Sequence, residues 1–505
     1  MAGNDPHAVV FPFPTQGHIN PLMLLAKRLL NAGISVTFVH TARTFSMLQK
    51  SLQNPLNQDD VDQGLHGSCS DAKLNIEVLP DEVATDTKGS PVSPSVVLFI
   101  SSIPAMRAHF ESLIYRLREC RRPPSCIIAD SFLPWVQDVA DHFNIPRIEF
   151  WSSTATSYSM GFCIPSLLSN GFLPMQPGTD SAAIIDLAPG IGPCPLVDFF
   201  YDLTYHPVTS PLFNFLQDAF ARGKEAQRVL VHSMHHLEKD VIHALRKEGI
   251  PMDPIGPLLE LVDGSTGRVK HKELRSMSLL TEDTDCLEWL NTHPKASVIY
   301  ASFGSNVKIS IEEIQELAVG LEESQQPFLL VIRPDLVAHG TYLDALPINF
   351  VERNQGRGRV SSWVPQRAVL AHPSVGGFFS HCGWNSVLES MWMGVPLIGS
   401  PRESEQNTNL KCLLDWKAAI AVDAKHSKVH IKQDLVKTAI KILMHEPEGE
   451  VVRRRMVQLK DEARFAIERG QSRSNLQKLV DDIKRMAFGE RPSFLANGSA
   501  SEAFA

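Results

Sequence analysis

Residues 7–40 alternate strand, turn, helix and strand, and this order constrains the fold more than any other feature of the sequence. The run 7–13 is apolar and rich in β-branched and aromatic residues, and it ends in the turn Pro-Thr-Gln-Gly at 14–17. An amphipathic stretch over 19–31 predicts a helix, and residues 35–40, SVTFVH, predict a second strand. A strand–helix–strand unit of this kind opens a doubly wound parallel sheet.

Two groups of alternating strands and helices follow, which predicts two domains. The chain has 505 residues, and a single hydrophobic core rarely serves more than about 250–300 residues. Later strands of the first sheet are expected at 126–129, 146–150 and 228–232, with 228–232 as the last. After a polar stretch at 262–276, helices are expected at 285–291 and 311–323 and strands at 297–302 and 327–332. Residues 52–90 and 174–200 are expected to be irregular loops.

Composition and charge argue against several classes of function. Hydrophobic residues make up 43% and charged residues 21% of the chain, which is typical of a globular protein. The net charge of -8 argues against a nucleic-acid partner, because phosphate binding requires a basic surface. No apolar run reaches the roughly 18 residues that span a bilayer, and the N-terminus lacks the basic start of a signal peptide. Eight cysteines without a Cys-x-x-Cys pair predict neither disulfides nor a metal site. We expect a cytoplasmic, monomeric protein.

The most informative segment is 363–406, WVPQRAVLAHPSVGGFFSHCGWNSVLESMWMGVPLIGSPRESEQ. Its residues 375–379 predict a strand, and a helix is expected to begin near 384–386, after a turn that contains Gly383. The first turn of a helix presents N–H groups and the positive end of the helix dipole, and both favour a phosphate. His381 adds a hydrogen-bond donor beside this turn. The segment therefore predicts an anion site.

The same segment offers partners for a nucleoside. Glu389 lies about one helical turn after Asn385 and Ser386, so it shares their face and could hold two adjacent ribose hydroxyls. Trp363 offers a flat face on which a base could stack. A nucleoside diphosphate fits all of these features at once.

This segment resembles the donor-binding signature of the plant family 1 UDP-glycosyltransferases. The match is at Trp363, Pro365-Gln366, His372-Pro373, 381–386 (HCGWNS), Glu389-Ser390, 394–396 (GVP) and Gln406. The resemblance continues at 14–18 (PTQGH), 286–289 (CLEW), 301–305 (ASFGS) and 470–472 (GQS), so it runs across nearly the whole chain. A match of this length with fixed spacing is highly specific.

The resemblance implies a role for each matching residue. It implies that the donor is held by Trp363 at the uracil, by Gln366 and Glu389 at the ribose, by His381, Asn385, Ser386 and Ser305 at the diphosphate, and by Trp384, Glu405 and Gln406 at the sugar. Val364, which follows Trp363, is counted with the donor-binding residues, and Ser152 is expected near the sugar or the diphosphate. The UDP-sugar is then a co-substrate, and no cofactor or metal ion is implied.

One part of the signature departs from the family pattern. The family usually has a Trp two residues before an Asp-Gln pair, whereas this chain has Glu403 and then Glu405-Gln406. In family members, Gln at the last position goes with glucose and His with galactose, so UDP-glucose is the expected donor. Glu405 keeps a carboxylate but adds a methylene group. Either the backbone lies farther back and the site holds the same sugar, which we expect, or the site suits a different sugar.

A histidine and an aspartate are placed for general-base catalysis. His18 comes at the turn after the first strand and Asp130 directly follows the strand 126–129, so both lie where ligands meet an open α/β sheet. The start of a helix disfavours an imidazolium, which keeps His18 neutral and able to accept a proton. A carboxylate behind the ring would fix its tautomer and stabilise the cation formed in the transition state. The family resemblance assigns the base to His18 and the orienting acid to Asp130.

Two other kinds of site have weaker support. Some sugar transferases hold the diphosphate through a metal bound by an Asp-x-Asp pair, and such strings occur at 60–62 and 283–285. The first lies in a polar loop and the second precedes a helix that it could cap, so neither has the context of a metal site. The Gly-x-Gly-x-x-Gly of a dinucleotide fold does not follow the first strand, and Gly356-Arg-Gly358 lacks the third glycine.

The expected fold is α/β, with two Rossmann-like doubly wound domains facing each other across a cleft, the architecture called GT-B. The expected parts are an N-terminal acceptor-binding domain over 1–250, a linker over 251–282, a UDP-sugar-binding domain over 283–471, a helix over 472–488 that crosses back to the first domain, and a mobile tail over 489–505.

The expected function is the inverting transfer of glucose from UDP-glucose to a hydroxyl of a small lipophilic acceptor, with a flavonoid or another phenolic as the first expectation. Terpenoid and hormone acceptors stay open, because the loops at 80–100 and 174–210 that would select the acceptor carry no readable code. Two other classes also stay open, a non-catalytic sugar-nucleotide-binding protein on the same fold and a sugar-nucleotide epimerase. The presence of both His18 and Asp130 favours the transferase.

Overall fold

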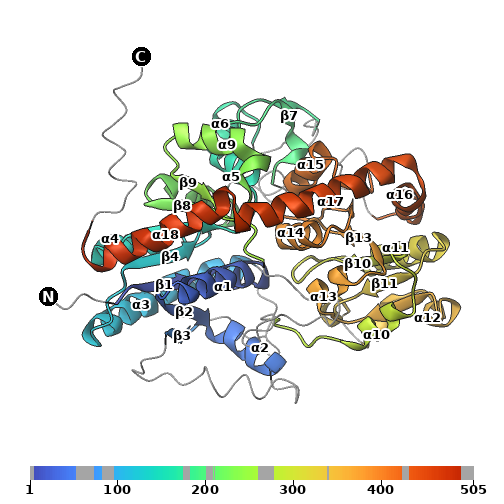
Figure 1. Cartoon of the computed structure of the whole chain (residues 1–505), viewed down its shortest axis with the longest axis horizontal. Helices are drawn as coiled ribbons and strands as arrows, with labels where there is room; N and C mark the ends of the chain where they lie inside the picture. The colour runs from blue at the N-terminus through green and yellow to red at the C-terminus, as the bar shows by residue number, and fades with distance from the viewer. Residues whose placement is uncertain are drawn as a thin grey trace. The chain divides into compact units, whose positions relative to one another are not determined.

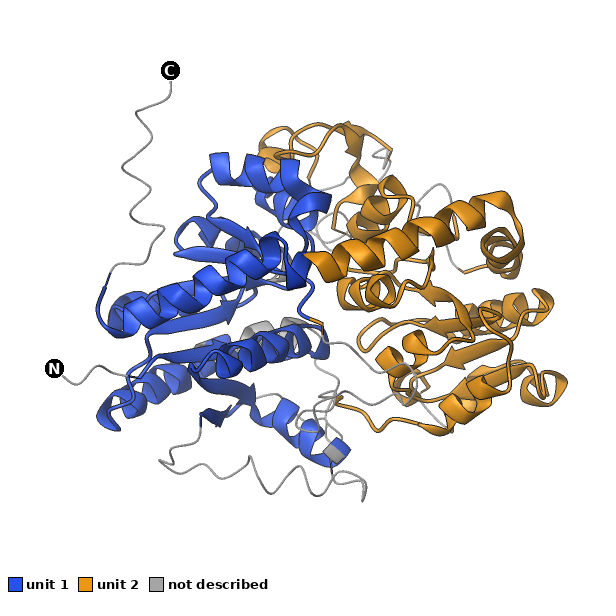
Figure 2. Cartoon of the chain, viewed as in Figure 1, with its two compact units in different colours: residues 1–165, 206–258, 466–505 blue, residues 166–205, 259–465 orange. Residues whose placement is uncertain are grey.

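The computed structural model describes residues 5–52, 73–81, 96–173, 182–200, 209, 211–259, 278–337, 340–423 and 431–490. Contacts within the chain divide it into two compact units, each with its own parallel sheet (Figure 1, Figure 2). Unit 1 comprises 1–165, 206–258 and 466–505, and unit 2 comprises 166–205 and 259–465. Residues 166–205 thus group with unit 2, whereas the sequence-based boundaries place them in the first domain. Those boundaries stay a prediction.

Unit 1 contains a seven-stranded parallel sheet in the order β3-β2-β1-β4-β5-β8-β9. Its strands are β1 (His7–Phe11), β2 (Ser35–Thr41), β3 (Leu74–Leu79), β4 (Cys126–Asp130), β5 (Arg147–Trp151), β8 (Arg228–Val231) and β9 (Met252–Pro254). Every residue of β1, β4, β5 and β8 is buried, as is typical of parallel strands covered on both faces.

The helices of unit 1 are α1 (Gln16–Asn31), α2 (Ala42–Leu52), α3 (Val96–Glu119), α4 (Val136–Phe143), α5 (Ala155–Phe162), α8 (Pro211–Ala221), α9 (His235–Lys247) and α18 (Gln471–Ala487). Polar contacts fix α18 to this unit. Ser472 Oγ donates to the carbonyl of Gly256 at 2.6 Å, and Arg228 pairs with Asp482 at 2.7 Å. Helix α18, the last helix among the described residues, therefore packs with the sheet of unit 1.

Unit 2 contains a six-stranded parallel sheet in the order β12-β11-β10-β13-β14-β15. Its strands are β10 (Val298–Ser302), β11 (Phe328–Val331), β12 (Gly358–Ser361), β13 (Val375–Ser380), β14 (Leu397–Gly399) and β15 (Ala419–Ala421). A separate antiparallel pair joins β6 (Ile184–Ile185) to β7 (Cys194–Pro195). Every residue of β10, β11 and β13 is buried, so the core of this unit lies around its central strands.

The helices of unit 2 are α10 (Asp285–Asn291), α11 (Ile311–Glu323), α12 (Phe350–Arg353), α13 (Gln366–Ala371), α14 (Trp384–Met393), α15 (Gln406–Asp415) and α16 (Gln433–His445). Two further helices, α6 (Ile164–Ser169) and α17 (Pro447–Glu468), each continue across a boundary between the units. Across the described ranges, none of the helices is both long and apolar enough to cross a membrane.

The expected strands at 7–13, 35–40, 126–129, 146–150, 228–232, 297–302, 327–332 and 375–379 are confirmed close to their predicted positions. Two sequence-based expectations about the sheet of unit 1 are wrong. The sheet of unit 1 does not end at 228–232, because β9 pairs with β8 beyond it. The expected loop 52–90 contains β3, which pairs with β2 along its whole length.

Candidate active site

Each sheet reverses its winding direction at one point, and predicted site residues lie at both points. In unit 1 the chain runs outward from β1 through β2 to β3 and then returns to β4, on the other side of β1. In unit 2 it runs from β10 through β11 to β12 and returns to β13 beside β10. Ligands of open α/β sheets bind beyond the C-terminal ends of the strands at such a switch point. His18 follows β1 and Asp130 ends β4, while Ser305 follows β10 and His381 follows β13.

His18, Asp130 and Ser152 come together in unit 1 although they are far apart in the sequence. His18 lies in the first turn of α1, and its Nδ1 is 2.8 Å from Oδ2 of Asp130. Asp130 is completely buried, and its other carboxylate oxygen accepts from the N–H of Phe132 at 3.0 Å. Ser152 Oγ lies 3.2 Å from the same His18 nitrogen. Because the buried carboxylate accepts the Nδ1–H, a neutral ring carries its lone pair on Nε2, as a general base requires.

Aromatic side chains surround the His18 ring. The ring centroids of Phe13 and Phe132 lie 5.2 Å and 5.4 Å from that of His18. Phe215 extends this group, with its centroid 5.8 Å from that of Phe132. The His18 side chain keeps 18% of its surface exposed, so the ring can reach a ligand. Apolar walls beside a partly exposed base suit a lipophilic ligand.

The start of α14 in unit 2 presents backbone N–H groups. The N-cap residue is Gly383, which has no side chain to bond the first N–H groups of the helix. Asn385 and Ser386 are the second and third residues of α14, and both lie in this first turn. With the positive end of the helix dipole, the turn forms an anion site of the kind that binds phosphate.

The His381 ring lies between two glycines beside the start of α14. A Cβ on Gly304 would lie 2.7 Å from Cε1 and Nε2 of His381, and a Cβ on Gly383 would lie 2.3 Å from Nε2. Burial, and secondarily the cation of Arg333, lowers the pKa of His381 to about 4. The ring is therefore neutral near pH 7. In the tautomer that carries its proton on Nε2, the neutral ring can donate a hydrogen bond from Nε2 to an anion.

Gln366 and Glu389 contact each other directly in the structure. Gln366 Nε2 donates to Oε2 of Glu389 at 2.7 Å and to Oγ of Ser386 at 3.0 Å. The hydroxyl of Tyr300 donates to Oε1 of Gln366 at 3.1 Å, which fixes the orientation of the amide. Burial raises the pKa of Glu389, and Arg367 and Gln366 oppose that rise. The two side chains are thus held in one arrangement, with Tyr300 as their support.

Trp363 is fixed by hydrogen bonds from both its ring and its backbone. Its Nε1 donates to Oγ of Ser278 at 3.0 Å, and its carbonyl accepts from the N–H of Asp283 at 2.8 Å. Val364 and Trp384, by contrast, expose only 3% and 2% of their surface. The backbone groups of these two residues, rather than their side chains, are therefore the parts suited to contact a ligand.

The sugar-facing pair of the signature lies at the start of α15. Glu405 is the N-cap residue and Gln406 the first residue of this helix. Oε1 of Gln406 accepts from the N–H groups of Arg402 and Glu403 at 2.9 Å and 3.2 Å. The amide NH₂ of Gln406 is therefore the group suited to bind a sugar hydroxyl. Oε1 of Glu405 accepts a long hydrogen bond of 3.4 Å from Nδ2 of Asn409.

Of the two Asp-x-Asp strings, the structure describes only the one at 283–285. The string at 60–62 lies outside the described residues. In the string at 283–285, the carboxylate of Asp283 pairs with Arg359 at 3.0 Å and accepts from Ser361 Oγ at 2.8 Å. Asp283 is therefore engaged in contacts within the protein. Within the ranges that the structure describes, no three His, Cys, Asp or Glu side chains are grouped so that they could hold a metal ion.

Comparison with known proteins identifies the family. Residues 280–460 match the family described as UDP-glucoronosyl and UDP-glucosyl transferase. The chain is 32% identical to the (R)-mandelonitrile beta-glucosyltransferase of Prunus dulcis, over 95% of this chain and 97% of that relative. It is 31% identical to the 7-deoxyloganetin glucosyltransferase of Catharanthus roseus, over 95% of this chain and 96% of that relative. The chain belongs to the plant UDP-glycosyltransferases.

Solved structures share the fold of this UDP-glycosyltransferase. The structure of Phytolacca americana UGT2, complexed with UDP-2fluoro-glucose and pterostilbene, aligns with a TM-score of 0.75 at 27% identity. The alignment covers 95% of this chain and 100% of that chain. The enzyme therefore has the GT-B fold, with one parallel sheet of seven strands and one of six.

Several residues at the candidate site of this transferase were given no role in the sequence-based prediction. They are Phe13, Phe132, Tyr300, Gly304 and Arg333. No local pattern points to Tyr300, because its partner Gln366 lies 66 positions away. No local pattern points to Arg333 either, because its partner Gly304 lies 29 positions away.

Proposed function

We propose that this transferase moves glucose from UDP-glucose to a hydroxyl group of a small lipophilic acceptor, with inversion at the anomeric carbon. The observation that carries the proposal is the distance of 2.8 Å between His18 and a buried Asp130 at the switch point of unit 1. A protein that only binds sugar nucleotides has no use for an oriented base, so this pair supports catalysis. Two relatives named as glucosyltransferases support glucose as the sugar.

In the proposed reaction, Nε2 of His18 removes the proton of the acceptor hydroxyl as that oxygen attacks the anomeric carbon. The bond between this carbon and the β-phosphate oxygen breaks, and UDP leaves with the bonding electrons. Asp130 stabilises the imidazolium that forms, because its carboxylate already contacts Nδ1. Attack from the face opposite the leaving group converts the α-linked donor into a β-glucoside.

The donor is proposed to bind unit 2. Trp363 stacks on the uracil, and Gln366 and Glu389 hold the ribose. The diphosphate then lies at the first turn of α14, where N–H groups, the hydroxyl of Ser386 and the neutral His381 ring stabilise the charge that develops on UDP. These groups, rather than a bound metal ion, are proposed to balance the diphosphate charge.

Phenolic acceptors, including flavonoids, are proposed first. The aromatic group formed by Phe13, Phe132 and Phe215 beside His18 supports a flat, lipophilic acceptor. Two similar proteins are named for mandelonitrile and 7-deoxyloganetin, and one similar structure is a complex with pterostilbene. Because these compounds are so varied, terpenoid or hormone acceptors are the second candidate. In the loops at 80–100 and 174–210, expected to select the acceptor, residues 82–95, 174–181, 201–208 and 210 lie outside the described residues.

UDP-glucose is expected to give a higher kcat/KM than UDP-galactose, UDP-xylose and UDP-glucuronate in competition with one good acceptor. Glu405 can accept bonds from two sugar hydroxyls, and Gln406 can donate from its NH₂. Glu405→Asp is expected to lower glucose transfer by up to about 10²-fold, because a misplacement of about 1 Å can cost that much. Preference for another sugar, or faster glucose transfer by Glu405→Asp, would contradict the proposal. Glu403→Asp makes the same change two residues away and is the matched control.

A further inference from the structure

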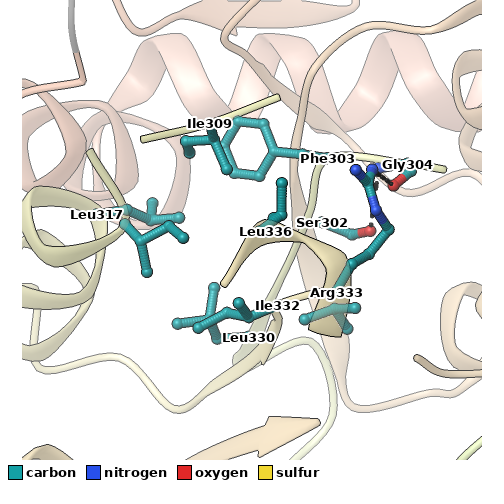
Figure 3. Close-up of a pocket in the computed structure, with 11 residues that line it drawn as sticks. Ser302, Phe303, Gly304, Ile309, Leu317, Leu330, Ile332, Arg333 and Leu336 are labelled. Atoms are coloured by element: carbon teal, nitrogen blue, oxygen red, sulfur yellow. Dashed lines mark hydrogen bonds between the residues drawn. The ribbon is translucent and has the colours of Figure 1, made fainter. Parts of the chain in front are cut away.

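Arg333 contacts the backbone of the segment that carries Ser305. It lies just after β11, and only 4% of its surface is exposed. Its Nη1 donates to the carbonyl of Gly304 at 2.6 Å (Figure 3). Its Nη2 donates to the carbonyl of Val307 at 3.0 Å. One guanidinium thus holds both ends of the segment 304–307, here named the Gly304 loop.

These two bonds determine the direction of the neighbouring N–H groups. A peptide unit is planar and trans, so its carbonyl and its N–H point in opposite directions. Because the carbonyl of Gly304 points to Arg333, the N–H of Ser305 points to the opposite side of the loop. Among the described residues, neither the N–H nor the hydroxyl of Ser305 has a hydrogen-bond partner. A cation on the carbonyl also polarises the peptide and makes its N–H a stronger donor.

The positive charge of Arg333 lies close to the predicted diphosphate site. Its acidic partner Asp335 accepts from Nε at 2.9 Å and from Nη2 at 3.2 Å and so offsets part of this charge. The Asp335 side chain is 57% exposed, so water screens its carboxylate more than it screens the buried guanidinium. The guanidinium also acts on His381. Burial lowers the pKa of that ring, and the positive charge of Arg333 lowers it further. A cation that is buried to this degree acts on a nearby anion with less screening than one at the surface.

An apolar hollow adjoins the Gly304 loop (Figure 3). Its lining includes the side chains of Phe303, Ile309, Leu317 and Leu336. None of these side chains can donate a hydrogen bond to the backbone of the loop. Besides the two bonds from Arg333, the backbone of the loop makes one long hydrogen bond to a described side chain, from the N–H of Gly304 to Oγ of Ser302 at 3.5 Å. Arg333 therefore contributes the two shorter of these contacts that orient the loop.

We infer that Arg333 is a positioning residue for the diphosphate of the donor and that it acts through the Gly304 loop. It aims the N–H of Ser305 at the β-phosphate and places a fixed positive charge behind that N–H. The inference rests on the proposed UDP-sugar function and extends it to a residue outside the donor signature.

The test compares UDP with uridine, which shares the base and ribose but lacks the phosphates. Arg333→Gln is expected to weaken UDP binding by about 10- to 100-fold, the size expected when hydrogen bonds to a charged group are lost. Uridine binding, measured by the same titration calorimetry, should be unchanged, which also shows that unit 2 is folded. Arg333→Lys keeps the charge but cannot hold two carbonyls in the planar geometry of a guanidinium, so a smaller loss of UDP affinity is expected.

Arg357→Gln is the matched control. Nη1 of Arg357 also donates to a backbone carbonyl in unit 2, that of Glu322 at 3.0 Å, but Arg357 lies just before β12 rather than after a strand. This variant should bind UDP and uridine as the wild type does. Wild-type UDP affinity in Arg333→Gln, or equal losses for UDP and uridine in both Arg333 variants, would overturn the inference. A wild-type enzyme that binds neither ligand would instead contradict the proposed function.

Discussion

His18→Ala is expected to lower kcat for sugar transfer by about 10²–10⁴-fold, the usual contribution of a general base. The affinity for UDP should be unchanged, because His18 belongs to unit 1 and the proposed uridine and phosphate contacts belong to unit 2. The reason for the large effect is geometric. Asp130 fixes Nδ1 at 2.8 Å, and alanine leaves no group to take the acceptor proton. Steady-state transfer and UDP titration on the same preparation measure both quantities.

His142→Ala is the matched control for this prediction. His142 lies on the exposed surface of unit 1, where Nε2 contacts the hydroxyl of Tyr115. The control should transfer sugar at the wild-type rate. If His18→Ala kept more than about a tenth of the wild-type kcat, well above what loss of a general base leaves, His18 would not be the base.

Gly304→Ala is expected to abolish detectable binding of UDP. Gly304 has φ +69, which is unfavourable for alanine, and the added Cβ would lie 2.7 Å from two atoms of the His381 ring. Either the ring or the Gly304 loop must move, and both are proposed to contact the diphosphate. The affinity for uridine should fall much less, since the atoms nearest to the new methyl group belong to His381 and not to Trp363, Gln366 or Glu389. Titration with both ligands measures the difference.

Gly356→Ala separates backbone strain from the clash. Gly356 has φ +81 in the same unit, and a Cβ there would have no neighbour within 4 Å. Both alanine variants should lose roughly 1–2 kcal/mol of stability from the left-handed backbone. Only Gly304→Ala should lose UDP binding. Equal UDP affinity in the two variants would show that the contact between Gly304 and His381 has no part in donor binding.

The buried strands were predictable because each is a short apolar run bounded by turns. β1, β4 and β8 are buried along their whole length, and such strands read as continuous hydrophobic segments. β3 was missed because most of its residues are only partly buried and its sequence, LNIEVL, mixes polar and apolar residues. β9 was missed because it has three residues and ends at Pro254, so no run is long enough to be seen.

The candidate site was predictable only where its residues lie close together in the sequence. The helix start at Trp384, with Asn385 and Ser386, could be placed from the strand and turn that precede it. The residues that support these groups come from other strands. Arg333 lies 29 positions from its partner Gly304, and Tyr300 lies 66 positions from its partner Gln366. Arg333 and Tyr300 come near the signature only because β10 pairs with β11 and with β13. The roles of the signature residues themselves stay predictions.

Proton NMR of the product formed from UDP-glucose and a phenolic acceptor tests the proposed reaction most directly. The donor is α-linked, and a single displacement by the oxygen that His18 deprotonates inverts that carbon. The proposed mechanism predicts a β-anomeric signal that grows in step with UDP release and requires the acceptor. An α-configured product, or UDP release that proceeds equally fast without acceptor, would contradict it.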